Sequence, residues 1–228
     1  MLDEYFAVTA KSQRVEILKA RELWASRADR VSVDVDGSQL RPFPYRPWRE
    51  TAAFDVVREV AAHRRSVRWF EPKPVDRATV MSAVEVGLMG PSACNRQSFR
   101  FFLLEDDDLR GKVAAVPMGT AGFADQIPLV GVIVGQHRGY EHQRDRHAIF
   151  VDGGLFAAGF IVALEASGLS SCCINWPELE DKNIAIQKLL DLDEDERVVM
   201  LIAIGYAQEG QLVPRSHKRS VENVVEWL

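Results

Sequence analysis

The feature that most restricts the fold of this chain is an uncharged stretch from Gly153 to Leu164. It predicts a helix over 152–167 with almost no polar side, which Gly168 can end as a left-handed cap. The uncharged stretch is short for a membrane span, which needs about 20 apolar residues. A helix that is apolar all round has to be covered all round. We therefore expect this helix inside a globular fold, either within one chain or at the core of a dimer.

A second apolar run, Leu129 to Gly135, predicts a strand that is covered on both faces. Helical periodicities alternate with further apolar runs after residue 51, and Asp76 precedes one helix as a candidate cap. These patterns predict a central sheet with helices on both faces, in the α/β or α+β class. Strands are expected at 99–104, 129–135, 170–175 and 197–206, and helices at 51–64, 77–89, 107–115, 152–167 and 178–190.

Residues 1–50 differ in pattern from residues 51–228, and we assign the two parts to separate domains. Apolar residues recur at helical spacing over 3–28 and predict a helix. Three prolines follow between residues 41 and 48, and each lacks the backbone donor that a helix requires. Residues 29–49 are therefore expected to form an extended arm, either a surface linker or an arm packed on a partner subunit. Its aromatic anchors are Phe43, Tyr45 and Trp48.

The composition argues against several classes of protein. A formal net charge of −5 disfavours non-specific binding to nucleic acid. The first residues lack the basic region of a secretory signal, and an odd count of 3 cysteines is typical of reduced thiols. Neither a CxxC nor an HExxH spacing occurs, so no metal site is expected. We expect a cytoplasmic protein that binds neither membrane nor nucleic acid.

A cluster of cations follows the helix expected at 51–64 and contains Arg64, Arg65, Ser66 and Arg68. Cations at a helix C-terminus stabilise its dipole, which accounts for Arg64 and Arg65 but not for Arg68. Arginines together with a hydroxyl also suit a phosphate dianion, because one guanidinium can bind two oxygens. Both interpretations are compatible with the sequence.

Two further segments carry polar groups that could bind a ligand. The turn expected at 90–98 holds Asn95 and Gln97, whose amides offer donors and acceptors to a planar heterocycle. Turn formation alone accounts for its Gly, Pro and Ser residues. Near the C-terminus, Lys218 and Arg219 precede a short apolar segment, and they either bind an anion or belong to a solvated tail.

In this order and with these intervals, the segments resemble the nitroreductase family of FMN-dependent NAD(P)H oxidoreductases. The resemblance runs from about residue 58 to the end of the chain. It implies an α+β fold with a central, mostly antiparallel sheet flanked by helices. It also implies an intertwined homodimer with FMN at the subunit interface. The segments that carry it are RRSVRWF at 64–70, PSACNRQ at 91–97, GLSSCCINW at 168–176 and IAIGYA at 202–207.

The resemblance implies a role for each matching residue. The first cationic segment would hold the phosphate and ribityl chain, with Arg68 near flavin N1 and O2. The turn at 91–97 would cover the flavin of the other subunit. Asn175 and Trp176 stand where the family usually has an acid and a glycine, so the Trp176 amide would face flavin N5 and its ring could cover the flavin. The implied cofactor-binding residues are Arg64, Arg65, Ser66, Arg68, Pro91, Ser92, Ala93, Asn95, Gln97, Asn175, Trp176, Lys218 and Arg219.

The segment at 136–147 is rich in arginine and histidine, and in the family this region helps to form the substrate pocket. Arg138, Tyr140 and Arg144 are its candidate pocket residues. One interpretation is an exposed loop. The other is a lid that recognises an anionic group, either a carboxylate or phosphate on the substrate or the 2′-phosphate of NADPH.

The activity implied by the resemblance is a ping-pong hydride transfer from NAD(P)H, through flavin N5, to a small organic acceptor. The acceptor would be of the nitro or quinone type, or a specialised biosynthetic substrate. No side chain needs to act as a nucleophile, since the flavin carries the chemistry. The alternative is a flavin-binding protein without reductase turnover, with a structural or regulatory role, which Trp176 and the N-terminal arm favour.

Overall fold

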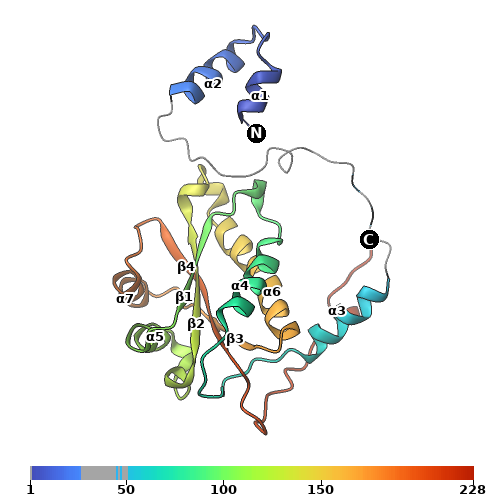
Figure 1. Ribbon diagram of the computed structural model, residues 1–228, viewed down its shortest axis with the longest axis vertical. Helices are drawn as coiled ribbons and strands as arrows, with labels where there is room; N and C mark the ends of the chain where they lie inside the picture. The colour runs from blue at the N-terminus through green and yellow to red at the C-terminus, as the bar shows by residue number, and fades with distance from the viewer. Residues whose placement is uncertain (1, 27–44, 46, 48–50) are drawn as a thin grey trace. The chain divides into compact units, whose positions relative to one another are not determined.

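The computed structural model describes residues 2–26, 45, 47 and 51–228 (Figure 1). The chain divides between Glu50 and Thr51 into two compact units. Most of the arm predicted at 29–49 lies outside the described residues, including Phe43 and Trp48. Tyr45 is described, and its side chain is exposed.

The described part of the first unit contains two helices, α1 (Leu2–Val8) and α2 (Val15–Ser26), where the sequence predicted one helix over 3–28. The segment is mostly helical, as predicted, but the prediction of one continuous helix is wrong. The Arg21 guanidinium donates a hydrogen bond of 2.7 Å to the Thr9 carbonyl, which lies in the break. A carbonyl at a helix end needs a partner from outside the helix, and here the Ser12 amide and Arg21 both donate to it.

The second unit is built on one antiparallel sheet, which confirms the predicted α+β class. Its strands are β1 (Phe99–Leu104), β2 (Leu129–Gln136), β3 (Ser170–Asn175) and β4 (Glu196–Gly205). They lie in the order β1-β2-β4-β3, and every pair is antiparallel. All four strands begin and end within one residue of the predicted bounds.

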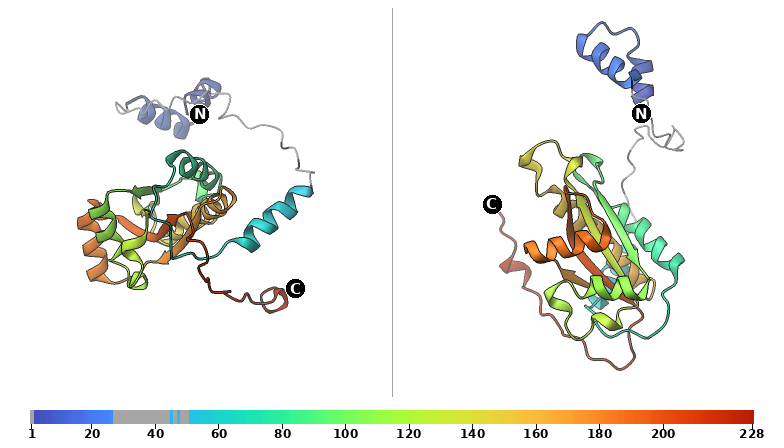
Figure 2. Two further views of the ribbon diagram at one scale, coloured as in Figure 1. Left: turned by 60° about the horizontal axis from the view of Figure 1, so that its bottom comes forward. Right: turned by 90° about the vertical axis from the view of Figure 1, so that its left-hand side faces the viewer.

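Helices cover both faces of this sheet, as the sequence predicted (Figure 1, Figure 2). On one face lie α4 (Arg77–Leu88) and α6 (Ala148–Ala166). On the other face lie α5 (Asp107–Ala114) and α7 (Glu180–Leu190). The remaining helix, α3 (Ala52–His63), contacts α6. The sheet therefore separates two hydrophobic layers.

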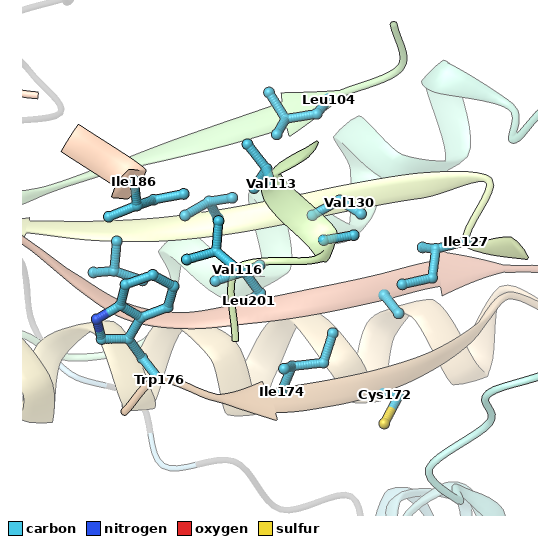
Figure 3. Close-up of a cluster of buried hydrophobic side chains, with 14 of the residues drawn as sticks. Leu104, Val113, Val116, Ile127, Val130, Cys172, Ile174, Trp176, Ile186 and Leu201 are labelled. Carbon is cyan, nitrogen blue, oxygen red and sulfur yellow. The ribbon is translucent and has the colours of Figure 1, made fainter. Parts of the chain in front are cut away.

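Alternation along β2 assigns its side chains to these two layers. Val130, Val132 and Val134 join the cluster under α5 and α7, part of which is drawn in Figure 3. Leu129 and Ile133 join the cluster under α4 and α6. Every residue from Leu129 to Gly135 is buried, because successive side chains point to opposite faces and both faces are covered.

The apolar helix α6 is the core helix of its layer. By length and composition it could cross a membrane, but Phe160 and Leu164 are fully buried against the sheet. It approaches α4 closely where Gly159 meets Gly87, because a Cβ on Gly159 would lie 3.3 Å from the Gly87 Cα. α6 begins at Ala148, before the predicted start at residue 152.

The segment after α3 runs along the outer edge of β3. Ser66 forms an isolated parallel bridge with Ser171, and the Val67 amide donates to the Ser171 carbonyl at 3.1 Å. Further on, Phe70 bridges to Ala207. This pairing brings the cationic segment of the sequence to one edge of the sheet.

Candidate functional site

The first candidate site is a cavity of about 630 Å³ between the end of α3 and the C-terminal tail. It brings Arg64 and Lys218, which are far apart in the sequence, to one place, together with Ser66. No aspartate or glutamate of the described chain lines it. Such a set of cations and hydroxyls suits a phosphate group. The lining residues are Ala61, Ala62, Arg64, Arg65, Ser66, Arg215, Ser216, His217 and Lys218.

The arginines predicted for this cavity are not equivalent. Arg65 folds back, and its guanidinium donates to the carbonyls of Ala62 and Arg64, the latter at 2.7 Å. It therefore caps the C-terminus of α3, as the helix-dipole interpretation expected. Arg219 does not line the cavity, because its guanidinium donates to the Asn223 carbonyl. Arg215 lines it instead, and the sequence reasoning missed this residue.

A second cavity, of about 310 Å³, lies at the outer edge of β3. Its walls are mostly apolar, and Arg68 provides its cation. The Arg68 Cζ lies 6.0 Å from the centroid of the Phe123 ring. An apolar cavity with a few convergent polar groups is typical of a ring-binding site. Its lining residues are Arg68, Met118, Gly119, Phe123, Cys172, Cys173, Ile174, Asn175 and Pro177.

Met118 and Phe123 of this second cavity were missed by the sequence reasoning. They come from the connection between α5 and β2, and neither of the two was itself predicted to contact a ligand. Burial raises the pKa of the Cys172 thiol, although the charge of Arg68 opposes the shift. Cys172 is therefore a neutral packing residue rather than a reactive thiolate.

The segment from Arg64 to Arg68 contributes residues to both cavities. Arg64 lies at one end of it and Arg68 at the other, and Ser66 is bridged to Ser171 between them. The Ser171 hydroxyl is buried and has no hydrogen-bond partner in the described chain. One elongated ligand with an anionic group at one end and a ring at the other fits this arrangement of donors.

Trp176 does not line the second cavity, although its neighbours Asn175 and Pro177 do. Its indole is buried in the hydrophobic cluster that includes Ile186 (Figure 3). The indole N–H donates to the Asn183 Oδ1 at 2.8 Å. The indole ring therefore does not cover the cavity. The prediction that it could cover a flavin, made because Trp176 stands where the family usually has a glycine, is not met within this chain. The reason is that strand alternation turns the ring toward the core.

Within one chain, the turn at 91–97 precedes β1, at the opposite edge of the sheet from β3, which lines the second cavity. It precedes Phe99, which pairs with Gly135 at one end of β2. Ser171 lies level with Leu129 at the other end of β2. Six strand residues separate the two levels, which is about 20 Å. None of Pro91, Ser92, Ala93, Asn95 and Gln97 lines either cavity.

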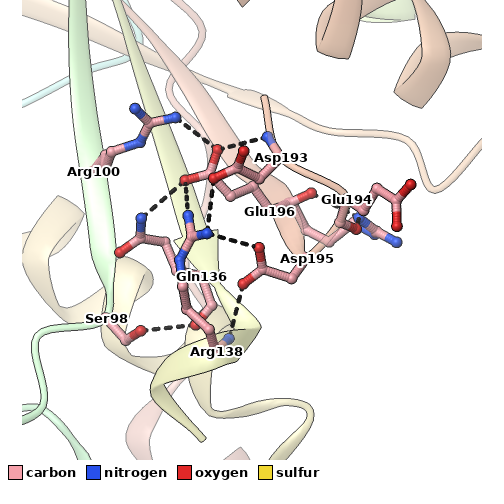
Figure 4. A network of polar contacts seen from close by, with 9 residues as sticks. Ser98, Arg100, Gln136, Arg138, Asp193, Glu194, Asp195 and Glu196 are labelled. Carbon is pink, nitrogen blue, oxygen red and sulfur yellow. Dashed lines mark hydrogen bonds and ion pairs between the residues drawn. The ribbon is translucent and has the colours of Figure 1, made fainter. Parts of the chain in front are cut away.

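The three pocket residues predicted at 136–147 have different environments. Arg138 pairs with Asp193 at 2.7 Å and with the buried Glu196 at 2.8 Å (Figure 4). Tyr140 is buried, and its hydroxyl donates to Asp152. Burial and this hydrogen bond raise the pKa of Tyr140 to about 12. Arg138 and Tyr140 thus make folding contacts and do not form an open lid, whereas the Arg144 side chain is 77% exposed.

Comparisons with known proteins show which family and which fold the chain resembles. The sequence profile described as the nitroreductase family matches residues 61–121 and 116–206, more than half of the chain. The NADH dehydrogenase of Thermus thermophilus is 25% identical over 75% of this chain and 95% of its own length. The iodotyrosine deiodinase of Haliscomenobacter hydrossis is 21% identical over 67% and 79%. The FMN-dependent nitroreductase of Clostridium difficile has the same fold, with a TM-score of 0.63, 18% identity and coverage of 74% and 96%.

Proposed function

This chain belongs to the nitroreductase family, and from that premise we propose that it is an FMN-dependent oxidoreductase. It would take a hydride from NAD(P)H and pass it to a small organic acceptor. The observation that carries the proposal is the pair of cavities, one cationic and one apolar, that are lined by the two ends of the segment from Arg64 to Arg68.

The residues of both cavities fit FMN by their chemistry. Arg64, Ser66 and Lys218 would hold the phosphate, and Arg65 would contribute to the positive potential around it. Arg68 and Asn175 would hold the polar edge of the ring. When bound, FMN supplies the hydride transfer between nicotinamide and acceptor. Arg68 would stabilise negative charge on the ring, and the apolar walls would strengthen this effect by excluding water.

We also propose that the working unit is a homodimer. If the turn at 91–97 covers a flavin, we expect it to come from a second copy, because in its own chain β2 and β4 separate β1, which follows the turn, from β3, which lines the second cavity. The monomer exposes apolar side chains in keeping with such an interface. They include Val151 of α6, Phe54 and Val57 of α3, and Val221, Val224 and Trp227 of the tail.

The visible spectrum of the purified protein tests the proposal. We expect a yellow protein whose flavin absorption is bleached by anaerobic NADPH or NADH. A yellow protein that resists bleaching would indicate flavin binding without turnover. A colourless protein that takes up no added FMN would contradict the proposed function. Light scattering on the same sample should give twice the mass of 25.6 kDa for one chain.

The acceptor is the finer part of the proposal. Relatives of this chain are named NADH dehydrogenase and iodotyrosine deiodinase, which differ in acceptor. We propose a nitro or quinone compound, or a specialised biosynthetic substrate, reduced in the cytoplasm. Turnover of NADPH with a nitroaromatic, a quinone and iodotyrosine in parallel would rank these classes. Equal rates with all three and with no acceptor would show that only oxygen is reduced.

A further inference from the structure

Asp152 is a carboxylate buried in the apolar helix α6, with only 3% of its surface exposed. Both of its oxygens accept hydrogen bonds from neutral donors. Oδ1 accepts from the Ala93 amide at 3.0 Å, and Oδ2 accepts from the Tyr140 hydroxyl. A buried carboxylate is unfavourable unless it is hydrogen-bonded, so these two contacts explain how it is kept in the core.

The contact with Ala93 holds a turn that is otherwise unfavourable. Cys94, Asn95 and Gln97 have φ values of 55°, 53° and 50°, in the left-handed region that non-glycine residues avoid. Such a conformation persists only where surrounding contacts determine it. Within the turn, the Ser92 hydroxyl accepts from the Gln97 amide at 3.2 Å. Asp152 is the residue of α6 that ties this turn to the body of the fold.

The contact with Tyr140 fixes a second segment to the same carboxylate. Tyr140 belongs to the 136–147 segment, and its ring lies 5.2 Å from the Arg96 Cζ. Asp152 is therefore enclosed between the turn and this segment, and one side chain sets the position of both. Replacing Asp152 should disturb the turn first. The Ala93 amide would lose its acceptor, and it has no other partner among the described contacts.

We propose that Asp152 is a positioning residue that presents the turn at 91–97 to the FMN bound by a second copy of the chain. The inference rests on the proposed function, since it takes the turn to cover a flavin. Asp152 lines neither of the two cavities and contacts the turn through the backbone of Ala93. Its loss should weaken FMN binding while the cationic cavity stays intact.

The test compares Asp152→Leu with Asp152→Asn in the full chain. Leucine has a similar branched shape but accepts no hydrogen bond. Asparagine can still accept from the Ala93 amide through Oδ1 and donate to the Tyr140 oxygen through its amino group. We expect FMN to bind about tenfold to a hundredfold more weakly to the leucine variant, and the asparagine variant to recover most of the affinity.

Two further variants separate positioning from general stability. Phe160→Leu removes buried volume from the same helix without touching the turn, so it should lower the melting temperature and leave the FMN dissociation constant unchanged. Tyr140→Phe keeps the Ala93 contact and should change FMN affinity less than Asp152→Leu. Hydrogen exchange of the turn in the FMN-free protein should rise in Asp152→Leu alone.

The outcomes distinguish this inference from the proposed function. If the wild-type protein binds no FMN, the proposed function fails and the positioning role fails with it. If wild type binds FMN and Asp152→Leu binds it equally well, the positioning role alone is wrong. A loss of affinity in Phe160→Leu as large as in Asp152→Leu would also overturn it, because stability would then explain both.

Discussion

Replacing Arg138 by alanine should destabilise the protein without weakening its use of NADPH. The Arg138 guanidinium lies 2.8 Å from the Glu196 carboxylate, whose side chain has 0% exposure. Its pairs with Asp193 and Asp195 are partly exposed and contribute about 0–1 kcal/mol. Glu196 keeps its hydrogen bond from Arg100, so we expect a loss of about 2 kcal/mol rather than the full penalty of an unpaired buried charge.

For a chain of this size, such a loss corresponds to a melting temperature lower by about 4–8 °C. Thermal unfolding followed by circular dichroism would measure it, with NADPH and NADH kinetics on the same samples. Arg144→Ala is the matched control, because Arg144 is exposed in the same segment. We expect it to leave the melting temperature unchanged and to raise the KM for NADPH if it reads the 2′-phosphate. An Arg138→Ala protein with wild-type stability and a raised KM for NADPH would refute this reasoning.

Further predictions concern the cofactor site and the core. Lys218→Ala should weaken FMN binding by about tenfold or more, and Arg219→Ala should weaken it less, because the Arg219 side chain is bound to a carbonyl outside the cavity. Fluorescence titration would measure both. Trp176→Phe should leave the bound-flavin spectrum unchanged and cost about 1–3 kcal/mol in the free energy of unfolding, by urea denaturation, through loss of the Asn183 hydrogen bond. Burial alone would raise the pKa of Glu196, but hydrogen bonds from Gln136 and Arg100 outweigh it and lower that pKa. Ionised Glu196 therefore contributes fully to the free energy of unfolding above the ordinary pKa of a glutamate, and this contribution is lost as the pH falls through the lowered pKa. A Glu196→Gln protein with the same acid unfolding profile as wild type would contradict this.

The sequence by itself determined the layered fold and most element bounds. Strand alternation and helical periodicity depend on neighbouring residues, so Leu129 to Gly135 could be identified as a doubly covered strand. The same holds for the Asp76 cap of α4, whose carboxylate accepts from the Thr79 amide at 2.9 Å. The cationic segment after α3 was also visible, because its arginines are contiguous in the chain.

The tertiary structure decided which of these polar groups are free to bind a ligand. Arg138 is occupied by acids that lie more than fifty residues away, and Tyr140 by Asp152 on the next helix. Trp176 is turned into the core, and Lys218 is brought beside Arg64 from the far end of the chain. A local sequence pattern reflects the backbone conformation that a residue prefers. The hydrogen-bond partners of its side chain come from segments that meet only when the sheet has formed.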